Sequence, residues 1–241
     1  MDEAFIRGAM TSDADESVYP FSIPAVKALD SIRFSPSVTF FVGENGSGKS
    51  TLTESIAVAA GFNAEGGTKN YNFTTQDTTS SLADNITLIR GSRREKYGYF
   101  LRAESFYTTA NYAENGTFDK YGPVPIFFEG KHIHEQSHGE AFLSIVRGFK
   151  PGLFIFDEPE SALSSQRQLV LLVAIRESVK QGSQFIIATH SPILLSYPGA
   201  KIYQLSQDGI EEVAYEEVEH VKLTKDFLNN PRSYLDRLLR D

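Results

Sequence analysis

Short, mainly apolar runs alternate with helical patterns along this chain. Three runs of four or five residues, at 38–42, 153–156 and 185–188, are continuous enough to predict strands buried on both faces of a parallel sheet. Two segments, Thr51–Ala60 and Ser164–Gln181, carry the pattern of helices. Strands that alternate with helices predict an α/β fold with a mostly parallel central sheet flanked by helices.

The second half of the chain adds further expectations. The helix predicted over 164–181 is apolar on nearly every side between Leu169 and Ile175, so we expect it to be sandwiched between other elements. Asp208-Gly209 separates two apolar runs, which predicts a hairpin that adds antiparallel strands. We expect the last segment, 226–239, to form one or two short helices around Pro231.

The stretch between the first two buried strands is the least regular. Residues 63–81 are rich in Gly, Asn, Thr and Ser, whereas Tyr99–Phe106 has the pattern of a strand and Ser137–Gly148 that of a helix. We therefore expect a single domain over residues 1–241 in which about 62–150 contains a small inserted lobe and the start of the helix at Ser137.

Composition excludes several classes of protein. The 241 residues are 41% hydrophobic and 22% charged, as in ordinary globular proteins. The longest apolar run, Leu169–Ile175, falls far short of the ~20 residues of a membrane span. The absence of cysteine excludes disulfides, thiolate zinc sites and cysteine nucleophiles. Since no basic-then-apolar segment begins the chain, we expect a cytoplasmic protein without a membrane span.

The charge balance does not favour nucleic acid as a ligand. The formal net charge is -8, whereas a sequence-independent DNA-binding protein must neutralise phosphates and usually carries a basic excess. The densest basic cluster is formed by Arg90, Arg93, Arg94 and Lys96. We interpret it as a solvated loop rather than a nucleic-acid contact.

Residues 43–50, with the sequence GENGSGKS, match the pattern GxxxxGK[ST] at every fixed position. The glycines let the backbone wrap closely around phosphate, and the N–H groups of the loop and of the following helix supply positive potential. Lys49 is expected to bind the β- and γ-phosphates of ATP, and the Ser50 hydroxyl to ligate Mg²⁺. The predicted nucleotide-binding residues are Gly43, Glu44, Asn45, Gly46, Ser47, Gly48, Lys49, Ser50 and Thr51.

Acidic and histidine side chains follow the other two buried strands. Asp157 and Glu158 end the strand at 153–156, and the carboxyl edge of such a sheet is where ligands bind. We expect Asp157 to hold Mg²⁺ through water and Glu158 to act as the general base on the attacking water. His190 follows the strand at 185–188, where it either contacts the γ-phosphate or is satisfied by a neighbouring loop. The first two motifs favour the γ-phosphate role.

A fourth segment precedes the helix at 137–148. Ser137 and Glu140 have the spacing of a capping box, which is a complete structural explanation by itself. The same arrangement places a hydroxyl and free N–H groups at a positive helix end. Because the subunit's own phosphate loop already binds the phosphates, this second anion site makes sense if it serves another subunit.

Together these motifs resemble those of the ABC-class ATPases. The residues that carry the resemblance are 43–51, Asp157-Glu158, 160–164 (ESALS) and 189–192 (THSP). Asn45-Gly46 and THSP resemble the non-transporter SMC/RecF-like branch. The whole chain is similar to small stand-alone members described only as predicted AAA-family ATPases, through 102–107 (RAESFY), 137–140 (SHGE) and 224–231 (TKDFLNNP).

The resemblance implies a homodimer that sandwiches two ATP molecules. Each site would combine the phosphate loop of one subunit with the signature serine of the other. Ser137 and Gly139 match the family signature Leu-Ser-Gly-Gly-Gln, whose other positions differ here, and 160–164 matches the segment at the dimer seam. Glu104 stands in the region of the family's lid glutamine, which makes it a candidate metal ligand.

The leading hypothesis is an ATP-hydrolysing, ATP-gated dimer that drives or switches a partner. The alternatives are an ATP-binding switch with negligible turnover, the nucleotide-binding subunit of a transporter, and a small-molecule kinase. Only 88 residues without heptads separate Lys49 from Ser137, which excludes a long coiled-coil arm. His132 and His134 form a weak candidate metal pair without an obvious third ligand. The partner, whether protein or nucleic acid, and the process are not specified; DNA repair, defence and translation-linked roles all fit.

Overall fold

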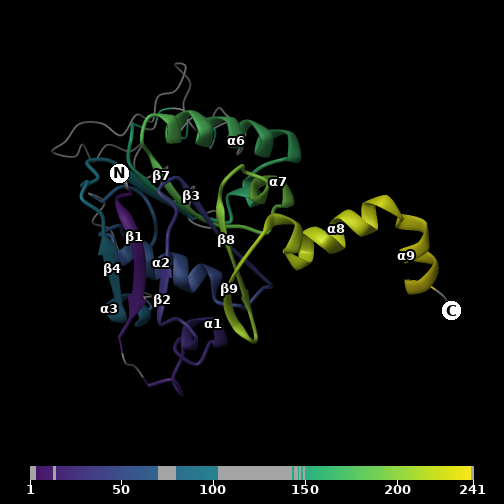
Figure 1. The fold of residues 1–241 in the computed structure, drawn as a ribbon, viewed down its shortest axis with the longest axis horizontal. Coiled ribbons are helices and arrows are strands. Elements are labelled where there is room, and N and C mark those ends of the chain that lie inside the picture. The colour runs from purple at the N-terminus through teal and green to yellow at the C-terminus, as the bar shows by residue number, and fades with distance from the viewer. Residues whose placement is uncertain are drawn as a thin grey trace.

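The computed structural model describes residues 4–12, 15–69, 80–102, 143, 146, 148 and 150–239. Its main feature is a six-stranded sheet in the order β5-β6-β7-β3-β8-β9, in which all neighbours are parallel except the terminal pair β8 and β9 (Figure 1). The strands are β3 (Val38–Gly43), β5 (Gly98–Arg102), β6 (Leu153–Asp157), β7 (Gln184–Ala188), β8 (Lys201–Ser206) and β9 (Gly209–Val213). The predicted α/β fold with a mostly parallel central sheet and an added antiparallel hairpin is confirmed.

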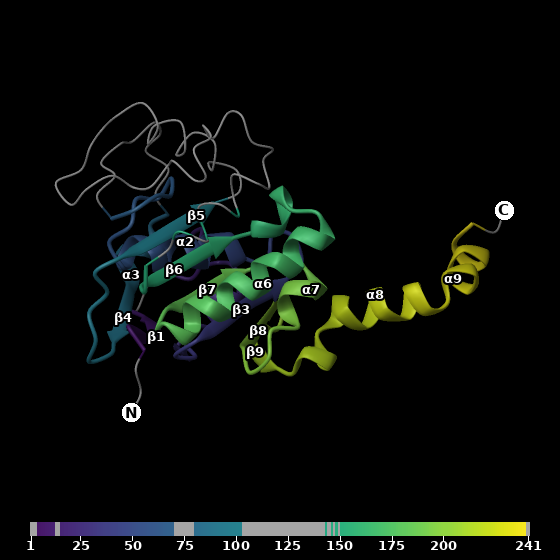
Figure 2. The same ribbon diagram turned by 90° about the horizontal axis from the view of Figure 1, so that it is seen from above.

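The central strands are buried on both faces, as their continuous apolar sequences predict. Every residue of β6 and β7 is buried. Neighbouring residues of β3 serve opposite faces, since Phe40 belongs to one hydrophobic cluster and Phe41 to the other. Helix α2 (Lys49–Ala59) packs in the Phe41 cluster and α6 (Ser165–Lys180) in the Phe40 cluster, so that one helix covers each face (Figure 2). The sheet thereby fixes the helix that follows the glycine-rich loop.

A second, three-stranded sheet was not predicted from the sequence. It consists of antiparallel strands in the order β2-β1-β4, with β1 spanning Ile6–Thr11, β2 Ser31–Arg33 and β4 Ile86–Arg90. Its apolar side chains join the same cluster as Leu52 and Ile56 of α2, so this sheet closes the core over that helix. Two short helices, α1 (Pro24–Lys27) and α3 (Leu82–Asn85), complete this side.

One buried side chain ties the two sheets together. The Gln184 amide at the start of β7 accepts hydrogen bonds from the backbone N–H groups of Phe5 and Ile6, both at 3.0 Å. It donates to the carbonyls of Ile6 at 2.7 Å and Ser35 at 2.8 Å. All four groups are buried, where an unpaired polar group costs free energy. A single amide therefore sets the position of β1 against the central sheet.

Only part of the segment predicted to hold an inserted lobe lies within the described residues. Within 62–150, strand β4 belongs to the small sheet and β5 to the central one. Leu143 and Val146 are helical, as predicted, and pack in the core beside α6. The proposed lobe and the start of the helix at Ser137 lie outside the described residues, so both stay predictions.

The expectation that the helix at 164–181 is sandwiched is wrong. Helix α6 spans Ser165–Lys180 after the N-cap Ser164, but Leu169 is 55% exposed and Val173 62% exposed. Only Leu171, Ile175 and Ser178 are buried. Successive helical residues are about 100° apart, so a continuous apolar run surrounds the helix, whereas one sheet can cover only one face. In Figure 1, α6 lies on the outside of the sheet.

Two alanine variants of this helix should therefore differ strongly. Leu171→Ala removes a fully buried side chain and should lower the free energy of unfolding by about 2–5 kcal/mol. Leu169→Ala, two residues earlier and exposed, should change it by less than about 0.5 kcal/mol. Urea denaturation followed by circular dichroism measures both values. Equal losses of unfolding free energy for the two variants would mean that Leu169 is also buried, as in a sandwiched helix.

The C-terminal elements match their prediction. Strands β8 and β9 form the hairpin, and Gly209 adopts a φ of +122°, a conformation that favours glycine. Two helices, α8 (Glu219–Asn229) and α9 (Pro231–Leu238), flank the break at Asn230, with α8 beginning earlier than predicted. No helix in the described ranges is long and apolar enough to cross a membrane.

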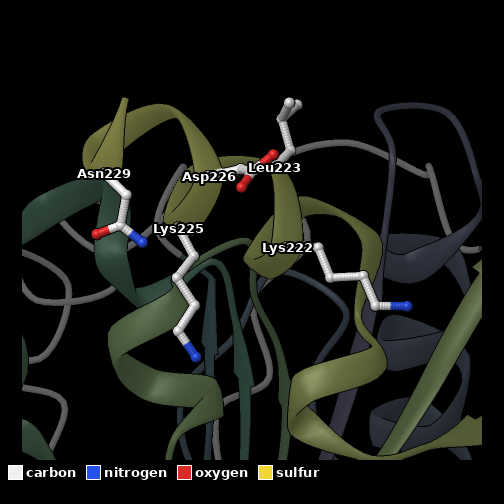
Figure 3. Close-up of a pocket in the computed structure, with 5 residues that line it drawn as sticks. All are labelled: Lys222, Leu223, Lys225, Asp226 and Asn229. Atoms are coloured by element: carbon white, nitrogen blue, oxygen red, sulfur yellow. The ribbon is translucent and has the colours of Figure 1, made fainter. Parts of the chain in front are cut away.

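Helices α8 and α9 form an arm that extends from the body (Figures 1 and 2). Its base is held in the core by Val218 and Val221, whereas most residues from Lys222 onward are exposed. A pocket on α8 is lined by Lys222, Leu223, Lys225, Asp226 and Asn229, whose side chains are drawn in Figure 3. None of these side chains belongs to the motifs at the sheet edge.

Candidate functional site

Three adjacent parallel strands bring the predicted site residues to one edge of the sheet. Strand β7 lies between β6 and β3, with Ala188 paired to both Asp157 and Phe41. The chain leaves these strands through the loop after Val42, the Asp157-Glu158 pair and the turn at His190. Because parallel strands end at the same edge, the three motifs meet where ligands bind in open α/β sheets.

The glycine-rich loop between β3 and α2 has the local geometry that its sequence predicts. Gly48, the N-cap of α2, adopts a φ of +95°, and a Cβ there would lie 2.9 Å from the Ile23 side chain. A Cβ on Gly43 would meet the Leu205 carbonyl oxygen at 2.4 Å, so that position also requires glycine. Glu44, Asn45 and Gly46 are exposed at the tip. The loop thus directs the N-terminus of α2 toward the site.

Lys49 is a buried cation in the first turn of α2. Its side-chain ammonium donates hydrogen bonds to the carbonyls of Gly43 and Glu44, both at 2.9 Å. Burial lowers the pKa of Lys49, an effect opposed by the negative charges of Glu158, Asp157 and Glu160. These contacts hold the ammonium over the loop.

Ser50 and Asp157 provide two neighbouring oxygen atoms. The Ser50 hydroxyl donates to Asp157 Oδ1 at 3.0 Å, and Asp157 is buried. Across the described part of the chain, no group of three or more His, Asp or Glu side chains is arranged to hold a metal. One hydroxyl and one carboxylate nevertheless fit Mg²⁺, which takes few protein ligands and completes its shell with water and phosphate oxygens.

Arg102, beside Asp157, and its partner Glu54 were not predicted as part of the site. Arg102 pairs in register with Asp157 across β5 and β6, and its Nε lies 3.9 Å from Asp157 Oδ2. The same guanidinium binds Glu54 of α2 at 2.7 Å. Arg102 lies inside the strand predicted at 99–106, but nothing in the sequence indicated that β5 lies next to β6.

Glu158 and His190 face one another across the ends of β6 and β7. The His190 Nε2 atom lies 3.5 Å from Glu158 Oε1. Glu158 has a φ of +51°, the only positive φ of a non-glycine residue in the described ranges, and strained conformations of this kind concentrate at functional sites. Burial and the charge of Lys49 lower the pKa of His190 below its usual 6.5, which favours a neutral imidazole at pH 7.

The base of the arm also reaches this site. The His220 ring on α8 lies 6.3 Å from the His190 ring, centroid to centroid. Burial lowers the pKa of His220, while its hydrogen bond with the His190 backbone opposes that change. This histidine was not singled out in the sequence, because it lies 30 residues after His190 in a helix without a recognised motif.

The remaining predicted site residues cannot be placed. Ser137, Gly139 and Glu104 lie outside the described residues, as do His132 and His134. The structure thus brings together the phosphate loop, Asp157, Glu158 and His190, whereas the signature segment and the lid position stay predictions.

Two family models match parts of this chain. A model described as "AAA domain" matches residues 22–156, and one described as "AAA domain, putative AbiEii toxin, Type IV TA system" matches residues 140–196. The first spans more than half of the 241 residues and contains the phosphate loop and most of β6. No curated protein sequence matches the chain.

The chain is also similar to solved structures at low sequence identity. An SMC head domain from Thermotoga maritima shares 15% identity and covers 86% of this chain and 98% of its own, with a TM-score of 0.47. CbiO1 from Clostridium perfringens, described as part of the ABC transporter complex cbiONQ, shares 17% identity, covers 86% and 90%, and scores 0.49. A nucleotide-free ATP-binding cassette from an ABC transporter shares 18% identity, covers 86% and 92%, and scores 0.47.

The predicted α/β fold with a mostly parallel sheet agrees with the observed strand pairing, and the predicted resemblance to AAA-family ATPases agrees with the matching AAA-domain model. With one family model spanning more than half of its length, the chain belongs to the AAA-domain family.

Proposed function

We propose that this protein binds ATP with Mg²⁺ and hydrolyses it to ADP and phosphate. The observation that carries the proposal is the meeting, at one sheet edge, of a buried lysine in a phosphate loop, the Ser50–Asp157 oxygen pair and the Glu158–His190 pair. Each group supplies one requirement of phosphoryl transfer to water: charge neutralisation, metal binding and orientation of the nucleophile.

The roles follow from position. Lys49 and the N-terminus of α2 bind the β- and γ-phosphates through charge-assisted hydrogen bonds. Ser50 and Asp157 would hold Mg²⁺, which would neutralise charge on the phosphate oxygens. Glu158 accepts a proton from the attacking water. His190, neutral at pH 7, orients the γ-phosphate beside it.

Phosphate release from purified protein tests this function directly. Release should require both ATP and Mg²⁺ and should stop when EDTA removes the metal. Tight ATP binding without phosphate release would contradict hydrolysis and would identify an ATP-binding switch instead.

We further propose that ATP brings two copies of the chain together. The support is the resemblance of Ser137 and Gly139 to the family signature and of 160–164 to the segment at the dimer seam. Ser161 and Ser164 of that segment are exposed, as a seam between subunits requires. A dimer of this kind is two-fold symmetric, and each subunit completes the partner's site.

Light scattering should show ATP shifting monomer toward dimer. The shift should be largest in Glu158→Gln, where the bridging γ-phosphate persists, and absent with ADP. Ser137→Arg should block the shift but preserve ATP binding by the monomer, because its bulky side chain would occupy the seam. A molecular mass that stays that of the monomer at saturating ATP would refute the proposed dimer. Ser137 would then serve only as a helix cap. The partner that such a dimer drives is not identified.

A further inference from the structure

We propose that Glu160 is a positioning residue that holds His190 opposite Glu158. The inference deepens the proposed ATP hydrolysis and rests on it. One oxygen of the Glu160 carboxyl, Oε1, accepts the backbone N–H of His190 at 2.5 Å. This bond satisfies the His190 N–H, which lies beyond the end of β7 and has no partner strand to bond to there.

Two of the hydrogen bonds between the exits of β6 and β7 enclose the Glu158–His190 pair. The first is between backbones, from the N–H of Glu158 to the carbonyl of Ala188 at 2.9 Å. The second runs in the opposite direction, from the N–H of His190 to the side chain of Glu160. Together they close a ring that contains both Glu158 and His190. The relative position of these two side chains therefore depends on the Glu160 carboxyl.

The backbone that carries Glu160 is itself well fixed. Residues 159–162 form a single 3₁₀ turn that begins with Pro159. The N–H of Ser161 donates to the Glu158 carbonyl at 3.1 Å, and the N–H of Leu163 to the Glu160 carbonyl at 2.9 Å. Leu163 is buried in the core. A carboxyl anchored in this way can restrain its partner instead of following it.

Burying the Glu160 carboxyl costs free energy of folding, which hydrogen bonds to it must offset. Its second oxygen, Oε2, is buried without a hydrogen-bond partner in the described part of the chain. Burial raises the pKa of Glu160, and hydrogen bonds from the His190 N–H, from the Glu160 backbone and from the Thr189 side chain oppose that rise. An apolar side chain of similar size would fill the space without the cost of burying a polar group. Of the groups that bond to this carboxyl, the His190 N–H is the one whose side chain faces Glu158.

Variants of Glu160 separate positioning from chemistry. Glu160→Ala should lower kcat for ATP hydrolysis by roughly 10- to 100-fold, because a small displacement of His190 is enough for such a loss. The KM for ATP should change by less than about threefold, since the phosphate loop is untouched. Glu160→Gln should retain most of the kcat, because its amide oxygen can accept the same N–H but cannot act as a base.

A double-mutant cycle tests whether Glu160 acts through His190. In the His190→Ala background, Glu160→Ala should lower kcat by less than about threefold, because the side chain that it positions is already gone. Glu95→Ala is the matched structural control. Glu95 is likewise a largely buried carboxylate, ion-paired with Lys69 and Arg90 in the loop before β5, and its loss should lower the melting temperature without a comparable loss of kcat.

Hydrogen exchange supplies a readout that does not depend on activity. The His190 backbone amide, followed by NMR, should exchange faster in Glu160→Ala than in the parent and Glu160→Gln proteins. The inference is overturned if that exchange is unchanged, if the kcat losses from Glu160→Ala and His190→Ala multiply, or if Glu160→Gln is as slow as Glu160→Ala. If the parent protein released no phosphate, the proposed hydrolysis would be refuted. The exchange data would still show whether Glu160 holds the His190 backbone.

Discussion

Glu158→Gln should bind Mg-ATP as the parent does and hydrolyse it about 10²- to 10⁴-fold more slowly, the usual effect of removing a general base. Glutamine keeps the shape and a hydrogen-bonding oxygen but cannot take a proton from water. The side chain is only partly buried and faces His190 at 3.5 Å, so the substitution should leave the fold intact. Calorimetry measures the binding, and phosphate release under single-turnover conditions measures the chemical step.

Glu177→Gln is the matched control for this experiment. Glu177 is an exposed glutamate on α6 whose contact is the exposed Lys180, so its variant should hydrolyse ATP at the parental rate. If Glu158→Gln kept its turnover within about threefold of the parent, the proton acceptor would have to be another group, and the mechanism above would be wrong.

Lys49→Ala should weaken the binding of Mg-ATP by roughly 10- to 100-fold. The lysine is the only side-chain cation in residues 43–51, and a charge-assisted hydrogen bond of this kind contributes about 1.5–3 kcal/mol. Titration calorimetry of the two proteins gives the difference in affinity. Lys180→Ala, which removes an exposed lysine on α6, should bind ATP as the parent does.

Lys49 also has a structural contact, so stability must be measured beside binding. Its ammonium bonds to the Gly43 and Glu44 carbonyls, and the alanine variant loses both contacts. Thermal unfolding should therefore show a modest loss for Lys49→Ala, with the folded state still dominant at 25 °C. Unchanged affinity in a folded variant would refute the assignment of residues 43–51 as the phosphate-binding loop.

Much of the site could be predicted because its parts are local. The phosphate loop depends on glycines at 43, 46 and 48 and on a helix that begins at once, all within contiguous residues. The acidic pair after β6 needs only a strand to precede it. Continuous apolar runs identified the three central strands, and the general rule for parallel sheets indicated their common edge.

Predictions failed or were missing where the outcome depended on partners far away in the sequence. The small β2-β1-β4 sheet consists of short strands whose partners are separated by long stretches of chain, so no local pattern revealed it. Helix α6 was expected to be sandwiched because its residues 169–175 are apolar on nearly every side. Its burial depends on how many layers the fold provides, and the sheet covers only one face.

The sequence by itself determined the class of fold, the phosphate loop and the residues at the ends of β6 and β7, because these follow from local periodicity and motif spacing. Only the tertiary structure decided which residues surround them. The register of β5 against β6 sets Arg102 beside Asp157, and the order β6-β7-β3 puts His190 across from Glu158. The Glu160–His190 tie spans 30 residues. Such contacts depend on strand order and register, which form only when distant segments pack together and which local sequence does not encode.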